Sequence, residues 1–456
     1  MGRHMQTLEG ATAQAGLKAE VIDHILDILQ IAFPIWLAEP AVDHRRVERP
    51  NGDGNYIISI ESYRDSRTLL NFRQKIDALE ILQSFDQFLK IKQPELFMMF
   101  STPYGSRRAL RGVELITHWC DVIFEAVKDG QDITQAIKQL IADLDCLLKI
   151  GTSTLKVMAP LIGLKLPDEV NQIDLAENIY IRRFDEKEIA EISSRNIEVD
   201  FLPQIAAHTT EVAIFINFPI IITYQEGGSS DENGYLVQQE IDNQLNIIVR
   251  SLHLLKEGRV SIVGTYLSYA PKVVPALSES VFSRSLVINP LGSMKLNTNE
   301  IESLISIYRR MNLAQRDEIY VASSRLVDAE FRTSSVDSLI DSIIGLETLL
   351  NPMDRDELSF RIALNYAFLG AEETRRSRYD AIRDIQKTRN KLVHGGAKKI
   401  AKKETETIGQ HAKLGKACLR DTINLFLNDP ILSSSKTLDV DFWLDKVIPS
   451  TADVKN

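Results

Sequence analysis

The segment Thr388-Arg-Asn-Lys-Leu-Val-His-Gly-Gly396 closes a stretch in which apolar residues recur every three or four positions. These apolar residues are Tyr379, Ile382, Ile385, Leu392 and Val393. The spacing predicts an amphipathic helix that ends at His394, with Gly395 as its C-cap. Arg389 lies on the apolar line, where a charge is costly unless it is paired. The pattern therefore predicts a helical fold for this region and a polar site at its packed side.

An acidic residue interrupts an earlier apolar line in the same way. Val336, Ile340 and Ile343 recur at helical spacing, and Glu347 follows four residues after Ile343. An acid and a guanidinium on two apolar lines are most simply explained if they meet, directly or through a neighbour, in a partly buried polar site. The alternative is a buried salt bridge that only fixes the register of two helices.

His394 lies four residues after Asn390, so the two positions share a helix face. The negative end of the helix favours a protonated imidazole, and histidine can transfer protons near neutral pH. A fixed arginine such as Arg389 can stabilise the charge of a phosphorane-like transition state. This set suits attack by an RNA 2′-hydroxyl on the adjacent phosphate, whereas DNA lacks that hydroxyl. The alternative for His394 is a hydrogen-bonded histidine at a helix end.

Arg389 and His394 do not share a helix face, because five residues rotate by ~140°. A single helix is thus poorly arranged to surround one phosphate. Two copies related by a two-fold axis would bring both residue types into one cleft. The spacing favours a homodimer or a higher homo-oligomer.

Basic residues are concentrated in this part of an acidic chain. The net charge is −10, yet residues 374–403 hold eleven Lys or Arg and only two acids, Asp380 and Asp384. This window is a candidate nucleic-acid contact, with RNA as the partner and the following candidate residues: Lys387, Lys391, Lys398 and Lys399. The alternative is a solvated helix face followed by a basic loop.

The remaining sequence predicts a multidomain α+β protein. Residues 1–165 read as a helical N-terminal region and residues 166–296 as a β-rich α+β domain, because short β-branched and aromatic runs appear there. Residues 297–432 are helical again, and residues 433–456 form a tail. The expected helices include 21–37, 69–91, 235–255 and 132–150, the last of which is ended by Gly151. The expected strands include 179–182, 212–218, 220–224, 261–267 and 280–288.

Several classes of site are missing from the sequence. It has no dinucleotide fingerprint, P-loop, zinc-protease motif or nucleophile elbow. Cys120, Cys146 and Cys418 are odd in number and far apart, which argues against a disulfide framework and a zinc site. We therefore expect no cofactor, no metal site and a reducing cytoplasm. The longest apolar run, residues 212–224, is shorter than the ~20 residues of a membrane span, so no membrane association is expected.

Three segments together resemble the Apea-like branch of the HEPN superfamily. They are Asp341-Ser-Ile-Ile-Gly-Leu-Glu-Thr-Leu-Leu350, Glu357-Leu-Ser-Phe-Arg-Ile-Ala-Leu364 and Ile385-Gln-Lys-Thr-Arg-Asn-Lys-Leu-Val-His-Gly395. The resemblance covers roughly residues 300–430. It implies a four- or five-helix bundle that commonly dimerises around a composite cleft.

The resemblance also implies a function. Many HEPN proteins are RNases of toxin and antiphage systems, which cut RNA without metal to a 2′,3′-cyclic phosphate and a 5′-hydroxyl. In that case Arg389, Asn390 and His394 would be catalytic and Glu347 would support them. Other members are inactive binding modules, so the alternative is a non-catalytic HEPN interaction or sensor protein. By analogy, residues 1–296 would receive a trigger ligand or protein.

Overall fold

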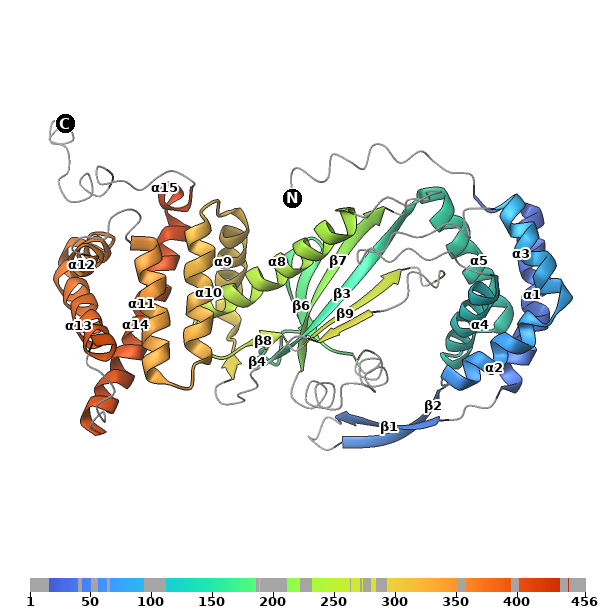
Figure 1. The fold of residues 1–456 in the computed structure, drawn as a ribbon, viewed down its shortest axis with the longest axis horizontal. Helices are drawn as coiled ribbons and strands as arrows, with labels where there is room; N and C mark the ends of the chain where they lie inside the picture. Colours follow the sequence, from blue (N-terminus) through green and yellow to red (C-terminus); the bar gives the residue numbers. More distant parts are fainter. Residues whose placement is uncertain are drawn as a thin grey trace. The chain divides into compact units, whose positions relative to one another are not determined.

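The computed structural model describes residues 16–39, 43–50, 56–63, 66–93, 112–185, 188, 211–221, 232–262, 264–270, 273, 280–283, 293–350, 358–394, 402–434 and 442. The chain divides into two compact units (Figure 1). The first comprises residues 1–160, 176–243 and 263–284, and the second comprises residues 161–175, 244–262 and 285–456. Residues of the predicted 166–296 segment thus occur in both units, and the predicted boundaries at 165, 296 and 432 stay predictions.

Five helices of the first unit precede its main strands. They are α1 (Ala19–Ala38), α2 (Ser66–Asp77), α3 (Glu80–Lys92), α4 (Gly112–Lys128) and α5 (Ile133–Ile150). The side chain of Asp132 accepts a hydrogen bond from the Gln135 amide at the start of α5. Gly151 ends the helix with φ +66°, a left-handed conformation that glycine adopts without strain. These caps explain why this helix has sharp ends.

Helix α1 is long and apolar enough to cross a membrane by length and composition alone. The sequence predicts a helix here, but it was not identified as a candidate membrane span. Its side chains Val21, Ile25, Leu29 and Trp36 are fully buried within the protein. A core helix of a soluble protein meets the same length and composition criteria, so α1 is weak support for a membrane span.

Strands occur earlier in the chain than the sequence indicated. β1 (Asp43–Pro50) and β2 (Tyr56–Tyr63) pair as an antiparallel hairpin with Asp43 opposite Tyr63. β3 (Thr152–Ile162) is an inner strand of the larger sheet, whose order is β10-β9-β3-β7-β6-β5, with β8 also paired to β3. The description of residues 1–165 as a helical region is therefore a partial error. The run Thr152–Ile162 was missed because it directly follows the predicted helix end at Gly151.

β5 (Gln172–Ala176) was also not expected, whereas the other strands of the larger sheet begin within a few residues of the expected positions. β6 (Ile179–Arg183) pairs antiparallel with β7 (Val212–Ile221), a single strand where two were expected. β9 (Gly264–Ala270) pairs with β10 (Ser280–Ser283). The remaining short strands are β4 (Leu164–Lys165), β8 (Ser261–Ile262) and β11 (Met294–Lys295).

The second unit is dominated by a helical bundle. Its helices are α9 (Ile301–Leu313), α10 (Asp317–Phe331), α11 (Ser335–Leu350), α12 (Leu358–Phe368), α13 (Arg375–His394), α14 (Lys402–Asn428) and α15 (Pro430–Ser433). Helix α11 packs against α10, α12, α13 and α14 (Figure 1). Gly345 permits the approach of α14, because a Cβ there would lie 2.7 Å from Leu419 Cδ2. The chain is thus mostly helical with a small antiparallel sheet, as the α+β prediction requires in outline.

Buried charges in this bundle are paired. Asp341 of α11 is 3% exposed and accepts hydrogen bonds from Arg332 Nε at 2.7 Å and from Arg325 Nη1 at 3.1 Å. These bonds join α10 to α11. A buried carboxylate with two guanidinium partners keeps its charge at a tolerable cost.

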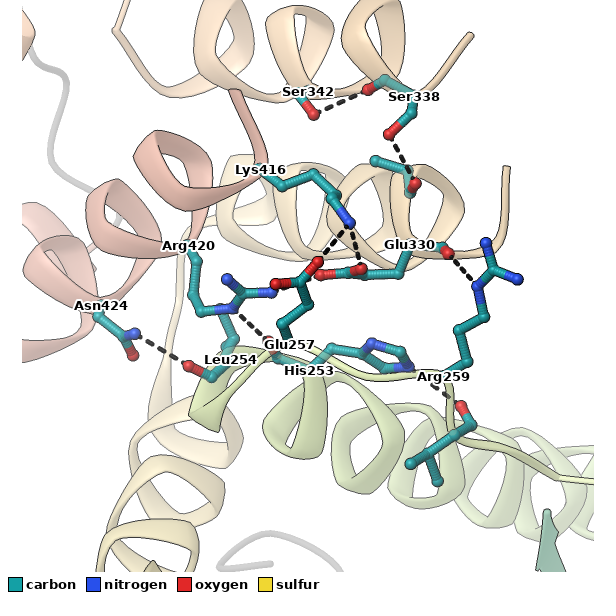
Figure 2. Close-up of polar contacts among 12 residues, drawn as sticks. His253, Leu254, Glu257, Arg259, Glu330, Ser338, Ser342, Lys416, Arg420 and Asn424 are labelled. Atoms are coloured by element: carbon teal, nitrogen blue, oxygen red, sulfur yellow. Dashed lines mark hydrogen bonds and ion pairs between the residues drawn. The ribbon is translucent and has the colours of Figure 1, made fainter. Parts of the chain in front are cut away.

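A second paired cluster joins the bundle to the end of α8 (Glu232–Leu255). Figure 2 shows Glu330 of α10 between Lys416 and Arg420 of α14. Arg420 Nε donates to the carbonyl of His253 at 2.8 Å, and Asn424 donates to the carbonyl of Leu254 at 3.1 Å. These donors satisfy carbonyls in the last turn of α8, which have no partner within the helix. The cluster holds α14, the helix against which α13 packs.

Candidate functional site

The predicted site residues Arg389, Asn390 and His394 all lie at the C-terminal end of α13. Ile382 and Ile385 are buried and hold this helix against the bundle. The apolar line then weakens, because Leu392 is half-buried and Val393 is 51% exposed. The end of α13 therefore extends from the packed part of the bundle toward its surface.

The structure brings two of the three predicted residues into contact. Arg389 is half-buried, and its Nη1 donates a hydrogen bond to Asn390 Oδ1 at 3.2 Å. Asn390 itself is exposed. His394 is the last residue of α13, and its side chain lies outside the described residues. The ~140° rotation expected between Arg389 and His394 applies to the helix that both occupy.

Glu347 lies on α11 and is half-buried, as its interrupted apolar line suggested. Burial raises the pKa of its carboxyl group, and the positive charge of Arg389 acts in the opposite direction. In the described part of the chain no hydrogen bond or ion pair joins the two side chains. The two groups are thus electrostatic neighbours, but the direct pairing allowed by the sequence is not formed.

A histidine that the sequence analysis did not consider lies beside this site. His411 of α14 shares a hydrogen bond with Thr388, the residue before Arg389, with 2.7 Å between Nδ1 and Oγ1. Both side chains are half-buried. Sequence spacing could not reveal this contact, because the two residues belong to different helices, α13 and α14.

Two of the four predicted RNA-binding lysines can be placed. Lys387 and Lys391 are exposed on α13, and Lys387 Nζ lies 3.9 Å from the Asp384 carboxylate. Lys398 and Lys399 lie outside the described residues. The two described lysines thus place positive charge on the solvent side of α13.

The arrangement combines a fixed cation, an amide and a poorly solvated carboxyl group on adjoining helices. A carboxyl group with a raised pKa can carry a proton nearer to neutral pH than an ordinary glutamate. A guanidinium at the edge of the bundle can contact an oxyanion from solution. Within the described ranges, no three His, Cys, Asp or Glu side chains are grouped so that they could hold a metal ion.

The comparisons with known proteins add no relative to this picture. No protein-family model matches the chain, and no curated protein or solved structure matches it. The resemblance of the quoted segments to HEPN proteins therefore stays a prediction from the sequence.

Proposed function

We propose that this chain is a metal-independent RNA endonuclease of the HEPN type, with its active site at the end of α13 and its helical bundle as the HEPN domain. The observation that carries the proposal is the half-buried Arg389, bonded to Asn390 and beside the poorly solvated Glu347. In a bundle that served only to pack helices, a partly buried guanidinium and carboxyl group without a direct ion pair would cost stability without compensation. The biological role proposed is that of a toxin or antiphage-defence effector.

The proposed reaction is a transesterification followed by release. A general base removes the 2′-hydroxyl proton, the 2′-oxygen forms a bond to the adjacent phosphorus, and the P–O5′ bond breaks. A general acid gives a proton to the leaving 5′-oxygen, so that a 2′,3′-cyclic phosphate and a 5′-hydroxyl result. We assign proton transfer to His394. Arg389 stabilises the additional negative charge on the phosphorane oxygens, and Asn390 orients Arg389 through their hydrogen bond.

The active form proposed is a homodimer built on the end of α13. The ~140° between Arg389 and His394 keeps one helix from presenting both groups to a single phosphate. A two-fold axis beside the helix would supply one group from each copy and would double the basic surface along the cleft. Sedimentation should therefore show a dimer in cleaving preparations.

The test is cleavage of labelled mixed-sequence RNA in EDTA by the wild type and by His394→Ala and Arg389→Ala. Each substitution should lower the rate by a factor of about 100 or more, because acid–base and oxyanion contributions are each of that order. Arg309→Ala is the matched control, since Arg309 is an exposed arginine on α9. DNA and 2′-O-methyl RNA should resist cleavage.

Two outcomes would contradict the proposal. Cutting of DNA at a rate comparable to RNA would exclude 2′-hydroxyl attack. Full RNA cleavage by His394→Ala would remove the proposed proton carrier. If the wild type leaves all RNAs intact, the chain is the alternative, a non-catalytic HEPN interaction or sensor protein.

A further inference from the structure

An exposed aromatic ring stands beside α13 on the neighbouring helix α12. Phe360 is 50% exposed, and its ring meets that of Tyr379 edge to face, with centroids 6.3 Å apart. Tyr379 is half-buried and supports the contact from α13. A phenylalanine that keeps half of its surface in water while its ring is supported by a second aromatic residue offers apolar ring surface to a ligand.

Positive charge continues from this aromatic pair toward the candidate active site. The guanidinium of Arg383 lies 5.6 Å from the centroid of the Tyr379 ring. Lys387 and Asn390 follow at four- and three-residue spacing, so they lie on the same side of α13. Tyr379 and Asn390 are eleven positions apart, which corresponds to roughly 16 Å of helix. Tyr379, the cations and Arg389 are thus arranged along α13, and Phe360 lies beside them on α12.

The charges along this line favour an anion. Residues 375–394 contain seven Lys or Arg against two Asp. Arg383 forms no ion pair with any carboxylate in the described part of the chain. An isologous contact with a second copy centred on Phe360 would bring the two Arg383 side chains together, and like charges oppose such an interface. A partly exposed ring next to Arg383, which has no ion pair among the described residues, and Lys387, which lies 3.9 Å from the carboxylate of the exposed Asp384, matches the alternating bases and phosphates of a single-stranded nucleic acid.

We infer that Phe360 and Tyr379 form a base-stacking platform for single-stranded RNA, with Arg383 and Lys387 contacting the phosphates between this platform and the active site. The identity of the ligand as RNA rests on the proposed function. The platform would hold a base several nucleotides from the bond that is cut. It would give the nuclease a requirement for unpaired RNA, because a base inside a duplex exposes no face for stacking.

The experiment is equilibrium binding of a fluorescent single-stranded 2′-O-methyl oligonucleotide in EDTA, measured by anisotropy. Blocking the 2′-oxygen prevents cleavage, so binding is measured independently of chemistry. Phe360→Ala and Phe360→Leu should weaken binding by on the order of tenfold, the usual contribution of one stacked base. Phe360→Tyr should bind like the wild type. Leu313→Ala, which removes a 76% exposed side chain from α9, is the matched control and should change nothing.

A second oligonucleotide that carries abasic sugars at every position separates stacking from charge. The wild type and Phe360→Ala should bind this abasic oligonucleotide with equal affinity. Arg383→Gln should weaken the binding of both oligonucleotides. Equal affinity of the wild type and Phe360→Ala for the normal oligonucleotide would overturn the platform. The platform would also be overturned if the wild type did not bind the oligonucleotide. The same would hold if Phe360→Ala changed only the mass of the dimer and left RNA binding unchanged.

The two proposals fail in different ways. If Phe360 governs binding but the wild type does not cleave unmodified RNA, the nuclease proposal fails and the platform stands. If cleavage depends on Arg389 while Phe360→Ala binds and cleaves like the wild type, only the platform fails. A thermal melt of each variant confirms that the bundle is folded.

Discussion

Removal of the Glu330 carboxylate should destabilise the bundle strongly. Glu330 is 3% exposed and lies 2.6 Å from Lys416 Nζ, and it also pairs with Arg420. The side chains of these two cations are only 12% and 16% exposed. Glu330→Ala therefore leaves two positive charges close together in a poorly solvated place, without the acid that neutralises them (Figure 2).

The contacts that survive set the size of the loss. Breaking a buried ion pair costs about 3–5 kcal/mol. Lys416 retains Glu257 at 3.2 Å, but Glu257 is 63% exposed and compensates little. Arg420 retains the His253 carbonyl. Because both cations are partly exposed, we expect the lower end of this range, a loss of about 3 kcal/mol in the free energy of unfolding. Glu330→Gln keeps the side-chain volume and should lose less stability than Glu330→Ala.

Hydrogen–deuterium exchange of peptides from α14 measures this loss in the unit that contains it. A destabilisation of about 3 kcal/mol should speed exchange of the protected amides by on the order of 100-fold. Glu302→Ala, at an exposed position on α9, is the control and should leave exchange unchanged. If Glu330→Ala exchanges less than about fivefold faster, corresponding to about 1 kcal/mol, the reasoning that its partners are costly buried cations is wrong.

Three further predictions concern the same bundle and are checked by urea denaturation followed by circular dichroism. Gly345→Ala should cost about 1–3 kcal/mol because of the close approach to Leu419, and the double variant with Leu419→Ala should lose less than the two single losses combined. Glu347→Gln should be more stable than the wild type at pH 8 and equal to it at low pH, because the raised pKa of Glu347 makes its ionisation costly only in the folded state; a destabilised variant at pH 8 would instead support a direct ion pair with Arg389. Burial lowers the pKa of His253 to about 4. The contribution of the neutral His253 to the free energy of unfolding should therefore be complete above pH ~6.5 and should fall as the pH is lowered to ~4. A constant difference in stability between the wild type and His253→Gln over that pH range would contradict this prediction.

The elements that the sequence predicted well are those with local signals. α5 was predictable because Asp132 and Gly151 mark its ends, and the helix expected over 235–255 corresponds to α8, which begins three residues earlier. The run 69–91 contains two helices, α2 and α3, because the chain breaks at Ala78 and Leu79 without a glycine or proline to announce it. β1 escaped prediction because its charged residues hide the alternation of a strand, whereas β2 has a single charged residue, Glu61, and was overlooked.

The candidate site shows the same division between local and tertiary information. A charge on an apolar line correctly indicated that Arg389 and Glu347 approach the packed side of their helices, because burial of a helix face follows its periodicity. The absence of a direct ion pair between Arg389 and Glu347 could not be predicted from the sequence, because it depends on how α11 and α13 are offset. The contact of His411 with Thr388 is likewise a product of helix packing alone.

The bundle contains two acids that are neutralised by direct cationic partners and one, Glu347, that is not. Glu330 and Asp341 are almost fully buried, and each has two cationic partners within 3.1 Å. Glu347 is less buried, yet burial raises its pKa and the charge of Arg389 only partly opposes this effect. A sequence selected only for stability would move Arg389 closer or replace Glu347 by an apolar residue. The unpaired state of both groups supports the proposal that their partner is a ligand, and an RNA phosphate approaching Arg389 would raise the pKa of Glu347 further by neutralising the one cation that lowers it.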